Sequence, residues 1–205
     1  MKFALLLVSF GLALSAQTAT TTPAPEVSYG LQKGSVGGTL SLGAAHMTGL
    51  QGLHAGGQGT VDIGLHKYVG VFMQAGWTPI RSDGSACSYG YCATARGSAN
   101  LYDLGAGVEV VGSNRSRFVP YGRLGVAYTH GSESASITAG GYGYGGYYSY
   151  SYSTSAPAIV TGGGLKTYIT HRLSLDTQLS LLRTVGQNGG GWVIAPTVGV
   201  SFQSK

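Results

Sequence analysis

The tripeptide His130-Gly131-Ser132 combines the two residue types that many hydrolases use as general base and nucleophile. Residues two apart in a strand share a face, so the His130 imidazole could activate the Ser132 hydroxyl. A working pair also needs a third group that orients the histidine. Glu133 would point to the opposite face, and a histidine and a serine are common where a strand runs into a polar loop. We therefore treat His130 and Ser132 as weak catalytic candidates and predict that the protein is not an enzyme.

The two cysteines, Cys87 and Cys92, enclose the four residues Ser-Tyr-Gly-Tyr. In an oxidising compartment such a close pair favours a disulfide within a loop. Free thiols, or half of a metal site, are the alternatives, although no second cysteine pair or nearby histidine supplies the other ligands. The glycine-rich stretches also lack the strand-to-helix context of nucleotide-binding motifs. We predict a disulfide, with no metal and no cofactor.

The N-terminus indicates export to such a compartment. Residues 1–16 read as a lysine, an apolar run and a small-residue cleavage site, which is the pattern of a secretory signal peptide. The apolar run is shorter than the roughly 20 residues of a membrane-spanning helix. Residues 17–30 form a Thr/Pro-rich leader, and residues 31–205 remain for one domain.

The composition is unusual for a water-soluble domain. Only 9% of the residues are charged, against about 25% in typical soluble domains, and 36 residues are glycine. The formal charge of +5 comes from scattered basic residues, without a Lys/Arg cluster among aromatic residues. We therefore expect no nucleic-acid partner.

Apolar residues recur with period two through most of the chain, which predicts amphipathic strands. We expect strands at 35–46, 59–66, 69–80, 98–111, 118–129, 156–169, 173–185 and 192–202. Short turns between them alternate with longer segments, of which 47–58, 81–97 and 131–155 are predicted surface loops. No apolar run after residue 16 is long enough for a membrane helix, and a closed barrel is the other structure that spans a bilayer. The prediction is an all-β, eight-stranded antiparallel up-and-down transmembrane barrel.

The strand faces favour a barrel in lipid. Residues 192, 194, 196, 198, 200 and 202 share an apolar face, and the opposite face is small or polar. A soluble barrel would turn the apolar face inward and need a charged exterior, which this composition lacks. With the apolar face outward, six charged side chains point into the lumen, where they need to pair. They are Asp62, Asp103, Glu109, Arg123, Lys166 and Asp176.

Two groups of aromatic residues stand out. Those near strand ends are candidates for the interfacial girdles of a membrane barrel: Trp77, Tyr102, Phe118, Tyr128, Tyr168 and Trp192. The others lie in the low-complexity segment 140–153, inside the longest predicted loop: Tyr142, Tyr144, Tyr147, Tyr148, Tyr150 and Tyr152. This segment reads either as a mobile Gly/Ser loop or as an adhesive surface, because tyrosine offers rigid amphipathic contact area.

The stretch 118–128 (FVPYGRLGVAY) and the closing 196–202 (PTVGVSF), together with a glycine-rich first strand, resemble opacity-type and OmpX-like outer-membrane β-barrels. The resemblance implies the outer membrane of a Gram-negative-type bacterium. It implies as partners the membrane lipid, including lipopolysaccharide, and the barrel assembly machinery. One class of lipid A deacylases among small barrels uses a His-x-Ser pair, but the surroundings of His130 do not resemble that class.

The expected function is structural, in the envelope, with surface loops that mediate adhesion or interaction with an extracellular ligand. A narrow small-solute pore and a lipid A-modifying enzyme are the alternatives. The interior of an eight-stranded barrel is about filled by side chains, which disfavours the pore.

Overall fold

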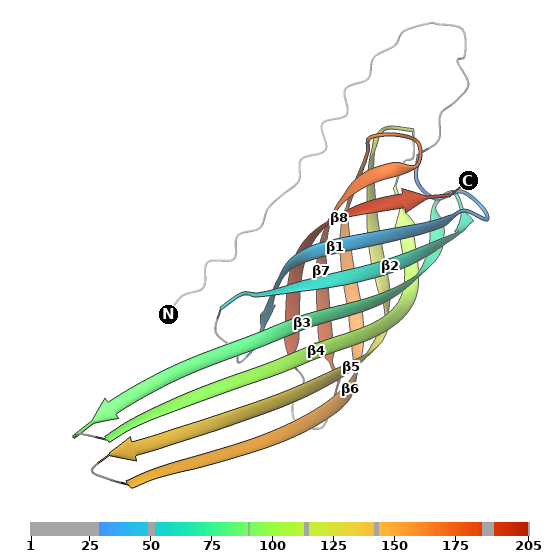
Figure 1. Cartoon of the computed structure of the whole chain (residues 1–205). Helices are drawn as coiled ribbons and strands as arrows, with labels where there is room; N and C mark the ends of the chain where they lie inside the picture. The colour runs from blue at the N-terminus through green and yellow to red at the C-terminus, as the bar shows by residue number, and fades with distance from the viewer. Residues whose placement is uncertain are drawn as a thin grey trace, which may run out of the picture.

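The computed structural model describes residues 29–48, 52–89, 91–112, 115–141, 144–185 and 191–204. The predicted signal peptide and residues 17–28 of the leader lie outside these ranges. The described chain forms eight strands, β1 (Val36–Met47), β2 (His54–His66), β3 (Val69–Ser88), β4 (Tyr91–Val111), β5 (Phe118–Gly141), β6 (Tyr144–Tyr168), β7 (Leu173–Thr184) and β8 (Trp192–Gln203). Successive strands pair antiparallel, and β1 also pairs with β8 to close the barrel (Figure 1). The predicted eight-stranded antiparallel barrel is confirmed.

The strands fall into two length classes. β1, β2, β7 and β8 have 12 or 13 residues, close to the roughly 9–11 residues of a transmembrane strand. β3 to β6 have 20 to 25 residues, and their far ends leave the barrel together as a four-stranded sheet (Figure 1). Among the described residues no helix is long and apolar enough to cross a membrane, a finding that does not bear on strands.

The prediction of long loops at 81–97 and 131–155 is wrong. β3 and β4 stay paired to Ser88 and Tyr91, and β5 and β6 to Gly141 and Tyr144. Glycine is depleted in strands, and clusters of serine with glycine are typical of loops, so the sequence of these segments predicts loops. Here each strand has a partner, so the hydrogen-bond ladder continues and overrides the propensity. In the segment 47–58 the strand also begins early, at His54.

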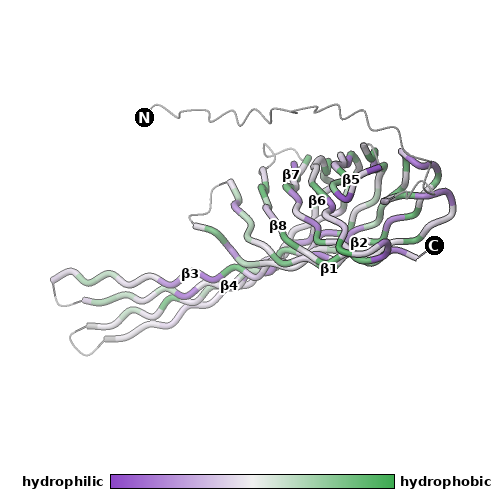
Figure 2. The backbone as a smooth tube through the Cα atoms, turned by 90° about the horizontal axis from the view of Figure 1, so that it is seen from above, coloured by the Kyte–Doolittle hydropathy of each residue, from purple (hydrophilic) through white to green (hydrophobic). Residues whose placement is uncertain are grey.

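The barrel wall is apolar outside and polar inside. Residues 192, 194, 196, 198, 200 and 202 of β8 all face outward, while Thr197 and Ser201 are buried inside. The alternation recurs on β7, where Ser174 and Asp176 are buried and Leu175 is exposed. Figure 2 shows green and purple segments alternating along the barrel strands, whereas the projecting strands are mostly pale. This confirms the predicted orientation of both faces and gives the barrel an exterior suited to lipid.

Five of the six predicted girdle residues lie exposed on the outer surface, namely Trp77, Tyr102, Phe118, Tyr128 and Trp192. The sixth, Tyr168, was predicted wrongly. Its ring is buried in the lumen and its hydroxyl donates to Gln203 Oε1 at 3.1 Å. Tyr168 lies two residues after Lys166, and residues two apart in a strand share a face. The alternation of the strand therefore predicts that Tyr168 points inward, although its aromatic type suggested the outer surface.

The chain just before β1 closes one end of the lumen. Leu31 is buried against Val111, Val119, Tyr121 and Tyr168. The Gly30 carbonyl accepts a hydrogen bond of 2.7 Å from the Gln203 side chain. Tyr29 and Gly30, assigned to the leader from the sequence, therefore pack against the barrel.

Candidate functional site

Four charged side chains from four strands meet inside the lumen, next to the apolar cluster around Leu31. Arg123 of β5 forms ion pairs with Asp62 of β2 at 2.8 Å and with Glu109 of β4 at 2.6 Å. Lys166 of β6 contacts the same two carboxylates at 3.2 and 3.1 Å. The two positive and two negative charges balance, and each residue is at most 4% exposed. This arrangement, the ion-pair plug, satisfies the pairing requirement of buried charges.

Uncharged side chains complete the ion-pair plug. The Arg123 guanidinium lies 4.8 Å from the Tyr121 ring centroid and 5.2 Å from that of Phe72. It also donates to Gln178 Oε1 at 3.2 Å. Sequence reasoning did not single out Tyr121, Phe72 or Gln178, although Tyr121 lies two residues from Arg123 and Gln178 two residues from Asp176, which puts each pair on one face.

The other two predicted lumen charges also point inward but form no ion pair within the described chain. Asp176 is opposite Lys166 in the β6–β7 register, yet its Oδ1 accepts a 2.7 Å hydrogen bond from the Tyr121 hydroxyl. Asp103 is separate from the ion-pair plug and accepts a hydrogen bond from Gln74 Nε2 at 3.2 Å. The sequence therefore predicted the face of all six residues, but not which of them meet.

Packed side chains occupy the described lumen at several levels. The apolar cluster around Leu31 lies at one end, and the ion-pair plug adjoins it through the Tyr121 ring. Beyond the plug lie two apolar clusters, one containing Val160 and Leu182, the other Met47 and Ile80. The cavity beside Gln74 and Asp103 has a volume of about 50 Å³, which suits a few water molecules rather than a solute.

The candidate catalytic residues lie on the outer surface. His130 and Ser132 share the outward face of β5 as expected, but the hydroxyl beside the imidazole is that of Ser155 on β6, at 2.9 Å from Nδ1. The His130 ring also stacks on Tyr102, with centroids 6.5 Å apart. Glu133 lies on the other face, where the Tyr150 hydroxyl donates to it at 3.5 Å. Among the residues that the structure describes, His130 thus has neither a hydrogen bond to Ser132 nor one to an acid that would orient its ring.

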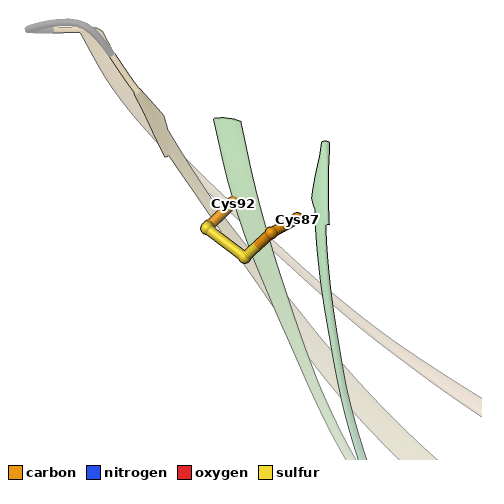
Figure 3. The surroundings of a disulfide bond; sticks show 2 residues. All are labelled: Cys87 and Cys92. Carbon is orange, nitrogen blue, oxygen red and sulfur yellow. A yellow bond between two sulfur atoms is a disulfide. The ribbon is translucent and has the colours of Figure 1, made fainter. Parts of the chain in front are cut away.

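The projecting sheet comprises residues 81–88 of β3, 91–98 of β4, 131–141 of β5 and 144–155 of β6. Cys87 and Cys92 are cross-strand partners near the tip of the β3–β4 hairpin, with Cα atoms 4.1 Å apart, and they form a disulfide (Figure 3). The bond thus joins two strands rather than closing a long loop. Tyr89 has a φ of +48° in the turn, a left-handed conformation uncommon outside glycine and asparagine.

The two faces of the projecting sheet differ in chemistry. The pairing from β3 through β6 has no register shift, so the alternation of side chains continues unbroken from the barrel into the projecting sheet. One side of the projecting sheet is therefore a continuation of the outer surface of the barrel. This side, the hydroxyl face, carries Arg81, Asp83, Arg96, Ser98, Ser132, Ser134, Ser136, Tyr147, Ser149, Ser151, Ser153 and Ser155. The Ser98 and Ser134 hydroxyls hydrogen-bond across strands at 2.9 Å.

The opposite side, the tyrosine face, continues the lumen wall. Tyr148, Tyr150 and Tyr152 of β6 line up on it and are 43–65% exposed. The rings of Tyr148 and Tyr150 are 6.5 Å apart between centroids. Tyr147 lies on the hydroxyl face, and Tyr142 lies outside the described residues. Tyr144 begins β6. The tyrosines thus form an ordered row on a strand, not a mobile loop.

The closed all-β ring, the apolar exterior and the filled, charge-paired interior together define the class of small outer-membrane β-barrels. Neither a protein-family model nor a curated protein matches the sequence.

Solved structures share the fold. Ail, the attachment invasion locus protein of Yersinia pestis, is 17% identical, with a TM-score of 0.53 over 84% of this chain and 100% of Ail. Ail in complex with the heparin analogue sucrose octasulfate gives 16% identity and a TM-score of 0.54 over the same shares. Neisserial surface protein A is 13% identical, with a TM-score of 0.51 over 82% of this chain and 95% of that protein. The fold and the apolar exterior agree with the predicted location in a bacterial outer membrane.

Proposed function

We propose that this chain is a non-enzymatic outer-membrane barrel that holds a rigid contact surface, the projecting sheet, outside the cell for adhesion. The observation that carries the proposal is the difference in strand length. β1, β2, β7 and β8 are only long enough to cross the membrane. β3 and β4 continue beyond it for about 26 Å, and β5 and β6 for about 36–40 Å, at about 3.3 Å per residue. A filled lumen supports the barrel as an anchor rather than a pore.

The tyrosine face is the proposed contact surface. Tyr148, Tyr150 and Tyr152 are exposed, and their backbone is held by β5, so little conformational entropy is lost on binding. Tyrosine provides both apolar ring area and a hydroxyl, which suits polysaccharide and protein surfaces. The attachment protein Ail has this fold, which supports the same kind of role for this chain.

The proposed partners within the envelope follow from the barrel. The exposed apolar wall contacts membrane lipid, and the residues beyond the girdle contact lipopolysaccharide headgroups. The closing strand β8, which ends in Phe202 and Gln203, presents the recognition element to the barrel assembly machinery.

The test compares two triple variants of β6 in cells that display the protein. Replacing Tyr148, Tyr150 and Tyr152 with serine should reduce attachment to matrix-coated, polysaccharide-coated and host-cell surfaces. Replacing Ser149, Ser151 and Ser153 with alanine changes the opposite face of the same strand and should leave attachment unchanged. Both variants should keep the mobility shift on boiling that folded barrels show in detergent. Equal attachment of all three proteins to every surface would contradict the proposal.

A further inference from the structure

The projecting sheet has two free edges. Within the described chain, β2 pairs with β3 only as far as Trp77, and β7 pairs with β6 only from Ala158 onward. β3 beyond Trp77 and β6 before Pro157 are each paired with one described strand. A free edge presents unpaired backbone N–H and C=O groups that another strand can pair with.

The β6 edge is the segment 147–155 of β6, and the backbone groups that it presents can be identified. The Pro157 carbonyl accepts a hydrogen bond of 2.8 Å from Val185 N, so the backbone of Pro157 points away from β5. Backbone groups alternate sides along a strand, and the β5–β6 register is unbroken. Residues 147, 149, 151, 153 and 155 therefore point their N–H and C=O toward the free side.

The β6 edge lacks the features with which proteins protect an edge strand. Residues 144–165 contain no charged side chain, and 147–155 contain no proline and no bulge. The other free edge, on β3, carries Arg81 and Asp83, and charged side chains discourage edge pairing. Of the two edges, the β6 edge is therefore the one suited to pairing.

The sequence of the β6 edge is complementary to itself. Tyrosine and serine alternate from 148 to 153. When two copies of this segment pair antiparallel about Tyr150, Tyr148 faces Tyr152 of the other copy and Ser149 faces Ser151. If one copy is shifted by two residues along the other, tyrosines still face tyrosines on one side of the paired strands. The pair is neutral, and aromatic cross-strand pairs stabilise antiparallel sheets.

From these observations, and resting on the proposed adhesive function, we propose that the partner of the β6 edge is the β6 edge of a second copy of this chain, paired antiparallel. Antiparallel pairing is the more stable arrangement and gives a closed two-fold dimer. The two projecting sheets then point in opposite directions, so the two barrels lie in different membranes. The contact joins neighbouring cells that carry the same protein.

The test uses the full-length mature protein in two vesicle populations with different fluorescent lipids. Wild-type populations should cluster with each other. Ser151→Pro removes one N–H on the free side, keeps the bonds to β5, and should reduce clustering about tenfold because a symmetric pair loses the hydrogen bond twice. Ser85→Pro is the matched control on the β3 edge. The Tyr68 carbonyl accepts a hydrogen bond from Val111 N, so even-numbered residues of β3 point their backbone groups toward β4. Odd-numbered residues, including Ser85, therefore point theirs toward the free side.

A charge exchange identifies the partner. Vesicles with Ser151→Lys should not cluster among themselves, nor should vesicles with Ser151→Glu, whereas the mixture of the two should cluster. Dispersed wild-type vesicles, equal losses for Ser151→Pro and Ser85→Pro, or no gain in the mixture would each overturn self-pairing. Attachment to foreign surfaces through the tyrosine face is measured separately, so failure here is distinguishable from failure of the proposed function.

Discussion

Replacing Arg123 with methionine tests the ion-pair plug. Methionine fills similar space without charge. The change leaves the Asp62 and Glu109 carboxylates, both almost fully buried, with only Lys166 between them. Removing one partner from a buried ion-pair network costs about 3–5 kcal/mol, because an uncompensated charge remains. Against a total stability of about 5–15 kcal/mol, this is a large loss.

The assay is urea unfolding of the refolded protein in detergent micelles, followed by tryptophan fluorescence and by the mobility shift on boiling. The double variant Arg123→Met with Glu109→Gln is the control, because it restores the charge balance around Asp62 and Lys166. It should regain about half of the lost free energy of unfolding. A loss below about 1 kcal/mol for the single variant, or no recovery in the double variant, would refute the argument that the lumen is dry enough for charge balance to matter.

Further predictions concern packing, the disulfide and conduction. Gly107→Val should destabilise the barrel by about 3 kcal/mol in the same titration, because a Cβ there would overlap the Leu124 carbonyl oxygen and the Gly125 Cα of β5 and would lie 2.8 Å from the Phe72 ring. Tyr168→Phe should cost about 0.5–1.5 kcal/mol through the lost hydrogen bond to Gln203. Cys87→Ser should increase protease cleavage within 81–98 while the mobility shift on boiling persists, because the disulfide joins only the tip of the β3–β4 hairpin. Planar-bilayer recordings of the wild-type protein should show no steady conductance.

The barrel portion was predictable because its strands carry a strong period-two pattern of large apolar residues. Strand starts at Val69, Phe118, Leu173 and Trp192 agree with the sequence expectation. The same parity predicted that Glu109 and the other charged residues of the ion-pair plug point inward. Parity gives the face of a residue but not its height along the lumen. The height of a residue depends on the register between neighbouring strands, and the apolar–polar pattern of one strand carries no information about that register.

The projecting sheet was missed because serine, glycine and tyrosine replace the valine and leucine that mark a strand. No face there is buried in lipid or lumen, so the usual apolar–polar contrast is absent. The remaining signal was the alternation of tyrosine with serine from 148 to 153, which has the strand period. The Gly/Ser/Tyr low complexity of the segment is more typical of a loop than of a strand, so the sequence predicts a loop there.

The outward face of β4 indicates where the membrane ends and the projecting sheet begins. Its residues run from Val108 and Leu104 through Tyr102 to Asn100 and then Arg96. Apolar, aromatic, polar and charged side chains thus follow one another on an unbroken register. At the transition the Trp77 indole N–H donates to Asn100 Oδ1 at 3.1 Å, as expected for an aromatic residue whose polar edge lies at the headgroup level. Since no bulge or turn separates the two parts, the sheet outside the membrane is a direct continuation of the barrel wall. A load applied to the tyrosine face would therefore reach the barrel through continuous strand ladders rather than through a loop.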